Sequence, residues 1–199
     1  MDLTKVRFGL EALCGRLEQT FIAKPFTWQG WNGAANGHGL ALLKPAGTEF
    51  AATKLPIGET IARAAAPSYV ADWSDLVAWA REGGEYVELC SECDGVGFTD
   101  CGHCGSYGGC GTCDGDGVEI ANHEPAMIGE VRFNRRLLWH YLRSMPTTER
   151  VLVSIGGKLE PLAFTCADDR WRVYIMPMRE SNDPAVTFPR GILRELAQA

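Results

Sequence analysis

Six of the eight cysteines lie between positions 90 and 113, and they form three C-x-x-C pairs: Cys90/Cys93, Cys101/Cys104 and Cys110/Cys113. Two residues between thiolates allow one tight turn to hold both sulfurs about 2.3 Å from a zinc ion, and two such turns complete a tetrahedron. Glycines fill the gaps between the pairs, and few apolar residues accompany them. A bound metal would therefore hold the segment, with a free energy of roughly 10–16 kcal/mol. The sequence predicts a zinc-binding knuckle whose simplest role is to staple a loop.

A redox role is the alternative for the middle pair, because Cys101-Gly102-His103-Cys104 matches the active-site motif of thiol–disulfide isomerases. That chemistry needs the first cysteine at the N-terminus of a helix that follows a strand, where the thiolate is stabilised. Here glycines and further cysteines surround the motif. We therefore favour metal binding.

The first and last pairs each read C-x-x-C-x-G-x-G, from Cys90 to Gly97 and from Cys110 to Gly117. This pattern resembles the cysteine-rich domain of J-domain co-chaperones, in which four such repeats bind two zinc ions. The resemblance implies that the first and last pairs share one zinc. Cys101 and Cys104 would then need other partners, for which His103 and His123 are candidates. The number of zinc ions, one or two, is left open by the sequence.

The composition points to a cytosolic globular protein. A formal net charge of −6 argues against a generally basic nucleic-acid binder but leaves room for a local basic surface. No apolar run could span a bilayer, and the N-terminus has no signal-peptide core, so we expect no membrane partner. Cytosolic thiols stay reduced, which favours metal over disulfides. We find no Ser/His/Asp arrangement, P-loop or dinucleotide fingerprint, and we expect no enzyme activity.

Outside the cysteine segment, one pattern of a short strand followed by a helix occurs three times, beginning at Val6, Val70 and Val131. Each helix has the apolar spacing of a buried face. Strand-like runs follow at residues 40–43, 49–52, 86–90, 151–155, 162–165 and 171–176. The unit is β-α-β-β(-β), so we predict an α+β fold with helices on one face of antiparallel strands. Residues 191–199 are predicted to form a short helix.

The larger aromatic side chains of these stretches are interpreted as core residues: Trp73, Trp79, Trp139 and Trp171. Cys14 and Cys166 lie in apolar contexts, and we expect both to be small buried hydrophobes.

The βαβββ unit repeated in tandem is how the bacterial DNA polymerase sliding clamp (β subunit) is built. VRFNRRLLWHYLRSM, VLVSIGGKLEPLAF and RVYIMPMR resemble the last half-unit of that clamp. Leu55–Thr60, LPIGET, with the helix after Val70 is similar to its middle domain. The resemblance implies about three clamp-like half-units with an inserted zinc knuckle. The predicted division is residues 1–88 for two half-units, 89–118 for the insert, 119–180 for the last half-unit and 181–199 for a tail.

The resemblance also implies two binding surfaces. The terminal strand of the family lines a groove for short peptides of replication proteins, and its counterpart here is Met176, Pro177, Met178 and Arg179. The alternative interpretation of this segment is an ordinary edge strand that ends at a proline. Clamps hold double-stranded DNA by phosphate contacts from basic helices, and the counterparts would be Arg132, Arg135, Arg136 and Arg143. A solvated helix face explains these arginines about as well.

A bacterial clamp subunit has six half-units, whereas this chain has about three, an added cysteine segment and an added tail. We therefore expect a shortened, zinc-bearing clamp relative, of the kind that a phage or mobile element encodes. Its expected role is a replication or recombination accessory that binds DNA or clamp-interacting proteins, with a homo-oligomer as one expected assembly. The alternatives are a clamp mimic or regulator that binds host replication or defence proteins without DNA, and a zinc-dependent chaperone-like adaptor.

Overall fold

The computed structural model describes residues 24–44, 50–53, 55–82, 88–89, 98–100, 107–109, 118–119, 125–179 and 184–196. The centre of this described part is one eight-stranded sheet, in which every neighbouring pair of strands is antiparallel. Its strands, in spatial order, are β1 (Phe26–Trp28), β2 (Trp31–Ala35), β3 (Gly39–Leu43), β13 (Trp171–Ile175), β12 (Leu162–Cys166), β11 (Arg150–Ser154), β4 (Tyr69–Asp72) and β15 (Leu193–Glu195).

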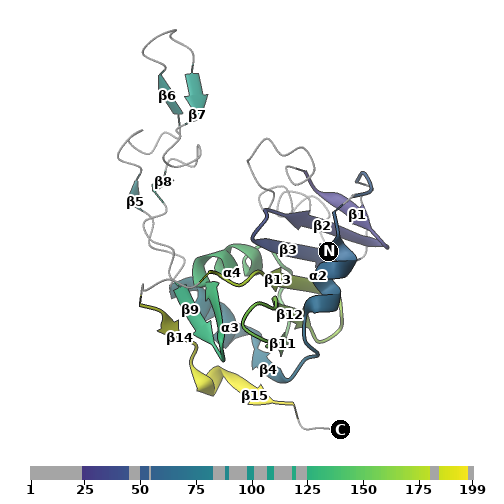
Figure 1. Ribbon diagram of the computed structural model, residues 1–199, viewed down its shortest axis with the longest axis vertical. Coiled ribbons are helices and arrows are strands. Elements are labelled where there is room, and N and C mark those ends of the chain that lie inside the picture. The colour runs from purple at the N-terminus through teal and green to yellow at the C-terminus, as the bar shows by residue number, and fades with distance from the viewer. Residues whose placement is uncertain are drawn as a thin grey trace.

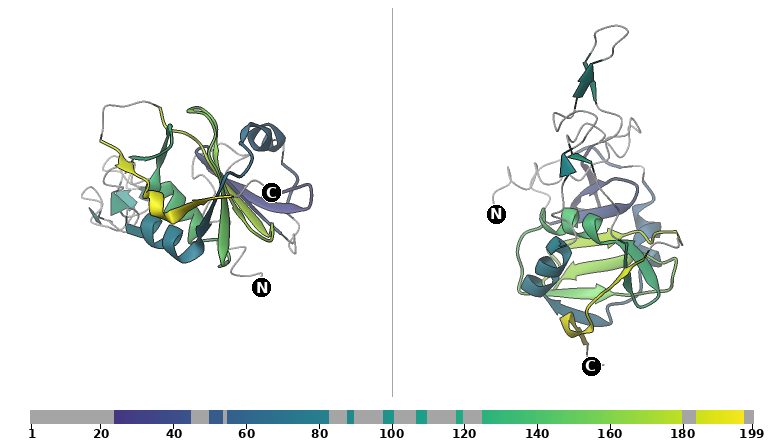
Figure 2. Two further views of the ribbon diagram at one scale, coloured as in Figure 1. Left: turned by 90° about the horizontal axis from the view of Figure 1, so that it is seen from below. Right: turned by 90° about the vertical axis from the view of Figure 1, so that its left-hand side faces the viewer.

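Two helices pack side by side on one face of this sheet, α3 (Trp73–Glu82) and α4 (Arg135–Leu142). A smaller sheet lies next to them and joins β10 (Val131–Asn134), β9 (Pro125–Ile128) and β14 (Val186–Thr187), in that order. A third helix, α2 (Ile57–Arg63), lies on the opposite face of the large sheet. The left view of Figure 2 shows the sheet nearly edge-on, with α2 on one side and the α3–α4 pair on the other.

The main core fills the space between the large sheet and the α3–α4 pair. Alternate residues of the central strands point into it, among them Val151, Val153, Phe164 and Trp171, all with no or almost no exposed surface. The period of two in a strand sends the remaining residues to the other face, where α2 covers part of them. Strand β3 is buried on both faces, so its sequence GLALL is a continuous apolar run.

The predicted α+β fold with antiparallel strands is confirmed, and α3 and α4 lie on one face of the large sheet as expected, but α2 lies on the opposite face, where Ile57 packs into a second apolar cluster. Strand β10, helix α4 and strands β11, β12 and β13 follow one another as a complete βαβββ unit. Strand β4 and helix α3 begin a second unit, and β1, β2 and β3 are three consecutive antiparallel strands. The first repeat, which begins at Val6, lies outside the described residues.

Several local predictions can be compared with the described elements. Trp79 and Trp171 are buried, and Trp73 and Trp139 are half-buried against the main core, as expected of packing residues. Cys166 is also buried, whereas Cys14 lies outside the described residues.

The helix predicted for residues 191–199 is wrong. Residues Arg190–Ile192 form a single 3₁₀ turn, and Leu193–Glu195 form strand β15. The helical spacing of Ile192, Leu193 and Leu196 is overridden because the adjacent edge of β4 offers main-chain partners.

Within the cysteine segment the structure describes only the backbone of four short strands. Strand β5 (Glu88–Leu89) pairs with β8 (Val118–Glu119), and β6 (Phe98–Asp100) pairs with β7 (Tyr107–Gly109). The pairing is nested, because β6 and β7 lie between β5 and β8 in the sequence. In Figure 1 these strands lie above the large sheet, beyond α4.

Candidate nucleic-acid face and C-terminal strand

Helix α4 contains two of the four arginines predicted to contact DNA, Arg135 and Arg136, and Arg143 is its C-cap. The start of the helix is fixed by a side-chain cap. Asn134 has extended backbone angles, and its Oδ1 accepts a hydrogen bond from the backbone N–H of Leu137 at 3.2 Å. This cap satisfies one of the free N–H groups of the first turn. The buried face of the helix consists of Arg135, Leu138, Tyr141 and Leu142.

Arg135 is part of that interior, and its whole residue is 5% exposed. Its Nε donates to the backbone carbonyl of Trp79 at 2.8 Å, its Nη2 reaches the same oxygen, and its guanidinium carbon lies 4.4 Å from the centroid of the Trp79 ring. The Nη2 also lies 3.1 Å from a carboxylate oxygen of Glu82. Arg135 thus ties α4 to the last turn of α3, and its guanidinium is directed into the interior and not toward a ligand at the surface.

The other arginines lie toward the surface. Arg136 is half-buried and Arg143 is exposed, and His140 stands between them. Their spacing of i, i+4 and i+7 places all three on one stripe of the helix surface. A guanidinium nitrogen of Arg143 lies 2.9 Å from Nδ1 of His140. Arg132, on β10, is half-buried.

Of the two paired helices, α4 is the one that carries the basic stripe. The exposed face of α3 carries Asp75 and Glu82 as well as Arg81, so its charges nearly balance. A phosphate backbone would therefore meet positive charge mainly along Arg136 and Arg143.

The segment Met176 to Arg179 continues from the end of β13 and runs toward the smaller sheet. The backbone N–H of Met176 donates to the carbonyl of His38 at 2.8 Å, and that of Met178 donates to the carbonyl of Arg132 at 2.7 Å. Met176, Pro177 and Met178 are half-buried and Arg179 is exposed. The strand predicted for residues 171–176 corresponds to β13, which ends at Ile175.

The six cysteines predicted to bind zinc lie outside the described residues, as do His103 and His123. Among the described residues, no group of three or more His, Cys, Asp or Glu side chains is arranged to hold a metal ion. The zinc site therefore stays a prediction.

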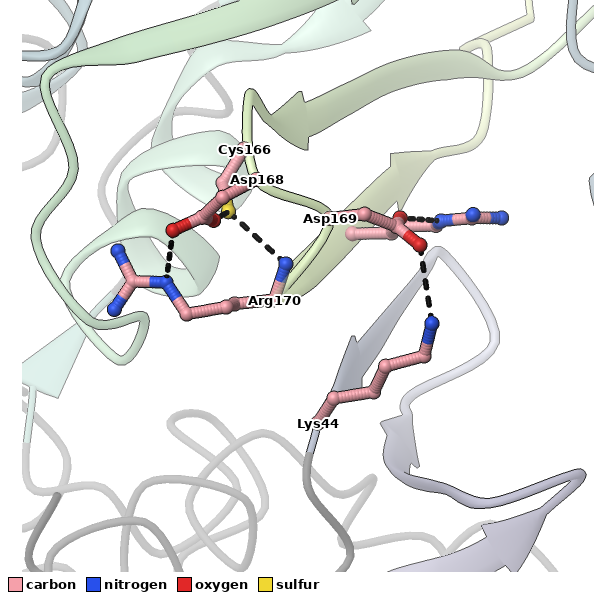
Figure 3. A network of polar contacts seen from close by, with 6 residues as sticks. Lys44, Cys166, Asp168, Asp169 and Arg170 are labelled. Carbon is pink, nitrogen blue, oxygen red and sulfur yellow. Dashed lines mark hydrogen bonds and ion pairs between the residues drawn. The ribbon is translucent and has the colours of Figure 1, made fainter.

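A polar network at the turn between β12 and β13 was not predicted from the sequence (Figure 3). The Cys166 thiol donates to a carboxylate oxygen of Asp168, and the same carboxylate pairs with Arg170. Burial, followed by the hydrogen bond to Asp168, raises the pKa of the Cys166 thiol. The hydrogen bond from Cys166 and the contact with Arg170 lower the pKa of Asp168. A thiol held in its neutral form is a packing group here, not a nucleophile.

The second half of this network centres on Asp169, whose backbone has a positive φ of 53°. Its carboxylate lies 3.0 Å from Lys44 Nζ and 2.6 Å from Arg172 Nε. Partial burial alone would raise the pKa of Asp169, but the hydrogen bonds and charges of Arg172 and Lys44 outweigh it and lower the pKa. Both cations also lie over the ring of Trp31, at 4.0 Å for Lys44 and 4.9 Å for Arg172. The only signal in the sequence was the Asp-Asp pair, which indicates a turn.

Comparisons with solved structures identify the fold class. A sliding clamp from Bacillus subtilis matches with a TM-score of 0.54 and 12% identity, over 90% of this chain and 63% of the clamp chain. A Pseudomonas aeruginosa clamp with ligand matches with a TM-score of 0.51 and 14% identity, over 89% of this chain and 64% of the clamp chain. The DNA polymerase III β subunit of Thermotoga maritima matches with a TM-score of 0.51 and 10% identity, over 90% of this chain and 64% of the clamp chain. No protein-family model and no curated protein sequence matches the chain.

The chain therefore has the fold of the bacterial DNA polymerase sliding clamps, as the sequence resemblance implied. It spans about 64% of the length of the clamp chains that it matches. At this identity the likeness establishes the fold alone. In the described part of the chain, no helix is long and apolar enough to cross a membrane.

Proposed function

We propose that this chain is a non-enzymatic, sliding-clamp-like accessory of DNA replication or recombination, of the kind that a phage or mobile element encodes in the cytoplasm. The observation that supports this most is the fold shared with solved clamps. Within that fold, helices α3 and α4 lie side by side on one face of the antiparallel sheet. A clamp holds DNA through phosphate contacts that do not depend on base sequence. The basic stripe of α4 has the chemistry for such contacts.

The DNA test is salt-dependent binding of the purified chain to double-stranded DNA. The double variant Arg136→Ala/Arg143→Ala should weaken binding for every sequence and reduce the slope of log K against log[salt] by about 2, because each arginine that neutralises a phosphate adds about 1 to that slope. Arg63→Ala/Lys158→Ala removes the same charge elsewhere and serves as the matched control, because Arg63 belongs to α2 on the opposite face of the sheet and donates to the carbonyl of Leu159, next to the exposed Lys158. Equal weakening in both double variants would show a diffuse charge effect and would exclude the stripe as the DNA face.

A second function is favoured by the segment Met176 to Arg179, which presents two half-buried methionines on backbone held at both ends. Methionine adapts to varied apolar partners because its side chain is flexible and polarizable. The chain would then be a clamp mimic or regulator that does not hold DNA. It would bind clamp-motif peptides, the short segments by which replication proteins attach to sliding clamps. Fluorescence polarization with such a peptide should show binding that Met178→Ala weakens at least tenfold, with Leu159→Ala as an exposed apolar control on another loop. Binding of peptide without any binding of DNA would favour this function over the first.

We also propose that the cysteine segment binds zinc through Cys90, Cys93, Cys110 and Cys113. The described ladders support this pairing, because they bracket both C-x-x-C segments: Leu89 pairs with Val118 at one end, and Phe98 pairs with Gly109 at the other. A four-thiolate site would need ligands from both C-x-x-C segments.

Native mass spectrometry with and without a chelator tests the zinc and the assembly together. One or two zinc ions per chain that are removed by the chelator would support the site, and the absence of zinc would overturn it. A symmetric metal-loaded oligomer would support a ring, whereas a monomer would favour the peptide-binding mimic. Client binding that disappears on chelation while the sheet stays folded would instead indicate a zinc-dependent chaperone-like adaptor.

A further inference from the structure

The chain contains two Asn-Gly dipeptides, and the fold places them in contrasting surroundings. Asn32-Gly33 lies inside β2, where Gly33 pairs with Phe26 of β1. Asn32 is 2% exposed, and a Cβ on Gly33 would lie 2.4 Å from the ring of Phe26. Asn36-Gly37 begins the turn between β2 and β3, where Asn36 is half-buried and Gly37 is exposed. The same dipeptide is therefore closed to water at the first position and open to it at the second.

The turn from Asn36 to Gly39 is closed by the side chain of Asn36. The Asn36 N–H donates to the Gly39 carbonyl at 3.3 Å, and its Oδ1 accepts from the N–H groups of His38 at 3.1 Å and Gly39 at 3.0 Å. Both partners are donors, so the side-chain atom that faces them is the carbonyl oxygen and not the amide nitrogen. Gly37, at the first central position, has a φ of +83°. The side chain of Asn36 is thereby folded forward over Gly37.

This arrangement favours attack of the Gly37 backbone nitrogen on Cγ of Asn36. The nitrogen loses its proton to solvent, a C–N bond forms, and the side-chain amide nitrogen leaves as ammonia, so a cyclic imide (a succinimide) closes. Two main-chain donors at 3.0 and 3.1 Å from Oδ1 lie at the distance that stabilises an oxyanion while negative charge develops on that oxygen. No atom lies within 4 Å of the place that a Cβ on Gly37 would take, so water reaches the imide.

We propose that Asn36-Gly37 is a site of spontaneous deamidation, at which solvent water converts the asparagine to aspartate or isoaspartate while the chain stays folded. Water that opens the imide at Cγ gives aspartate, whose carboxylate accepts the same two N–H groups. Water that opens it at the backbone carbonyl gives isoaspartate, in which the main chain runs through Cγ and is longer by a methylene group. This site depends on none of the DNA, peptide and zinc proposals.

The isoaspartate product would affect more than the turn itself. The carbonyl of His38 accepts a hydrogen bond from the Met176 N–H at 2.8 Å, and Gly39 pairs with Ile175 of β13. A longer backbone before His38 displaces its carbonyl relative to Met176. Because this hydrogen bond holds one end of the segment Met176 to Arg179, modification of the turn would loosen a segment that is distant in the sequence.

The first test is incubation of the full chain at mildly alkaline pH, in native buffer and in urea, followed by peptide mass spectrometry that separates the two asparagines. In the native chain Asn36 should deamidate at least about ten times faster than Asn32, a modest factor beside the roughly 10²–10³ that one oxyanion donor contributes. In urea the two rates should converge, since glycine follows both residues. Similar rates in the native chain would overturn the proposal. A preference for Asn36 that persists unchanged in urea would also overturn it, because the local sequence and not the fold would then set the rates.

The second test follows hydrogen exchange of the Met176 amide by NMR in the fresh chain and in the isolated isoaspartate form. Exchange should be about tenfold faster or more in the isoaspartate form, because an amide that loses its acceptor exchanges through a smaller local opening. Asn36→Asp is the matched control. It supplies the aspartate product without a change of backbone and should keep the protection of the fresh chain. Equal protection of Met176 in the fresh and isoaspartate forms would overturn the coupling between the turn and the segment.

Discussion

Replacement of Arg135 separates a structural arginine from a nucleic-acid contact on the same helix. Arg135→Ala removes both hydrogen bonds to the Trp79 carbonyl and the stacking of the guanidinium on the Trp79 ring. A hydrogen bond from a charged donor contributes about 1.5–3 kcal/mol. A desolvated cation–π contact contributes about 2 kcal/mol. These terms overlap, and we expect the variant to lose about 3 kcal/mol of unfolding free energy.

The contribution of Glu82 provides the internal comparison. Its side chain is 75% exposed, so the ion pair with Arg135 is screened by water and contributes at most about 1 kcal/mol. Glu82→Gln should therefore cost well under 1 kcal/mol. Arg135→Lys should fall between the two, because lysine keeps the charge but offers neither the planar fork nor the same stacking.

Urea denaturation followed by circular dichroism measures all three variants. The surface variant Arg136→Ala is measured beside them and should change the unfolding free energy by less than about 0.5 kcal/mol. A destabilisation by Glu82→Gln as large as that by Arg135→Ala would refute the reasoning, because the salt bridge and not the carbonyl contact would then hold α3 to α4. If Arg135→Ala leaves the unfolding free energy unchanged, Arg135 does not stabilise the contact between α3 and α4.

Three further predictions concern packing and charge. Phe188→Ala should cost about 3 kcal/mol in the same denaturation assay, because the ring is buried against Trp79; a surface-like effect below about 0.5 kcal/mol would contradict this packing. Asp169→Asn keeps a side chain that tolerates positive φ and removes only the charge, so it should cost about 1 kcal/mol or less at neutral pH. Because the native pKa of Asp169 is lowered, this difference should be present above the ordinary carboxyl pKa and disappear as the pH falls through the native one. A difference that persists in acid would show that the charge is not its cause. Gly39→Ala should cost about 1–3 kcal/mol, since the new Cβ would lie 2.6 Å from the ring of Tyr141, and a neutral outcome would mean that the ring can move.

The sequence predicted the helices and strands of the last half-unit well, because local patterns dominate there. The strand-like runs at residues 151–155 and 162–165 and the helical spacing of Leu138, Tyr141 and Leu142 each match an element of the structure. The Met176–Pro177 strand end followed from the inability of proline to donate in a ladder. The repeat of the strand–helix unit indicated the fold class before any contact was known.

The predicted site was a weaker inference, because spacing on a helix does not say which face is buried by a neighbour. Arg135 and Arg136 are adjacent in the sequence, yet the first is enclosed by Trp79 and the second stays near the surface. The network around Asp169 joins Lys44 to a turn that lies 125 residues later in the chain, and no local pattern announces such a pair.

The sequence by itself determined the half-unit pattern, the end of the last strand and the clustering of the cysteines, because each of these is set by neighbours within a few turns of chain. Only the tertiary structure decided that Arg135 supports α3, that residues 193–195 form a strand against β4, and that Phe188 packs on Trp79. The physical reason is the same in each case. Burial and main-chain pairing depend on groups far away in the sequence, and their free energy exceeds the local preferences of the residues that they override.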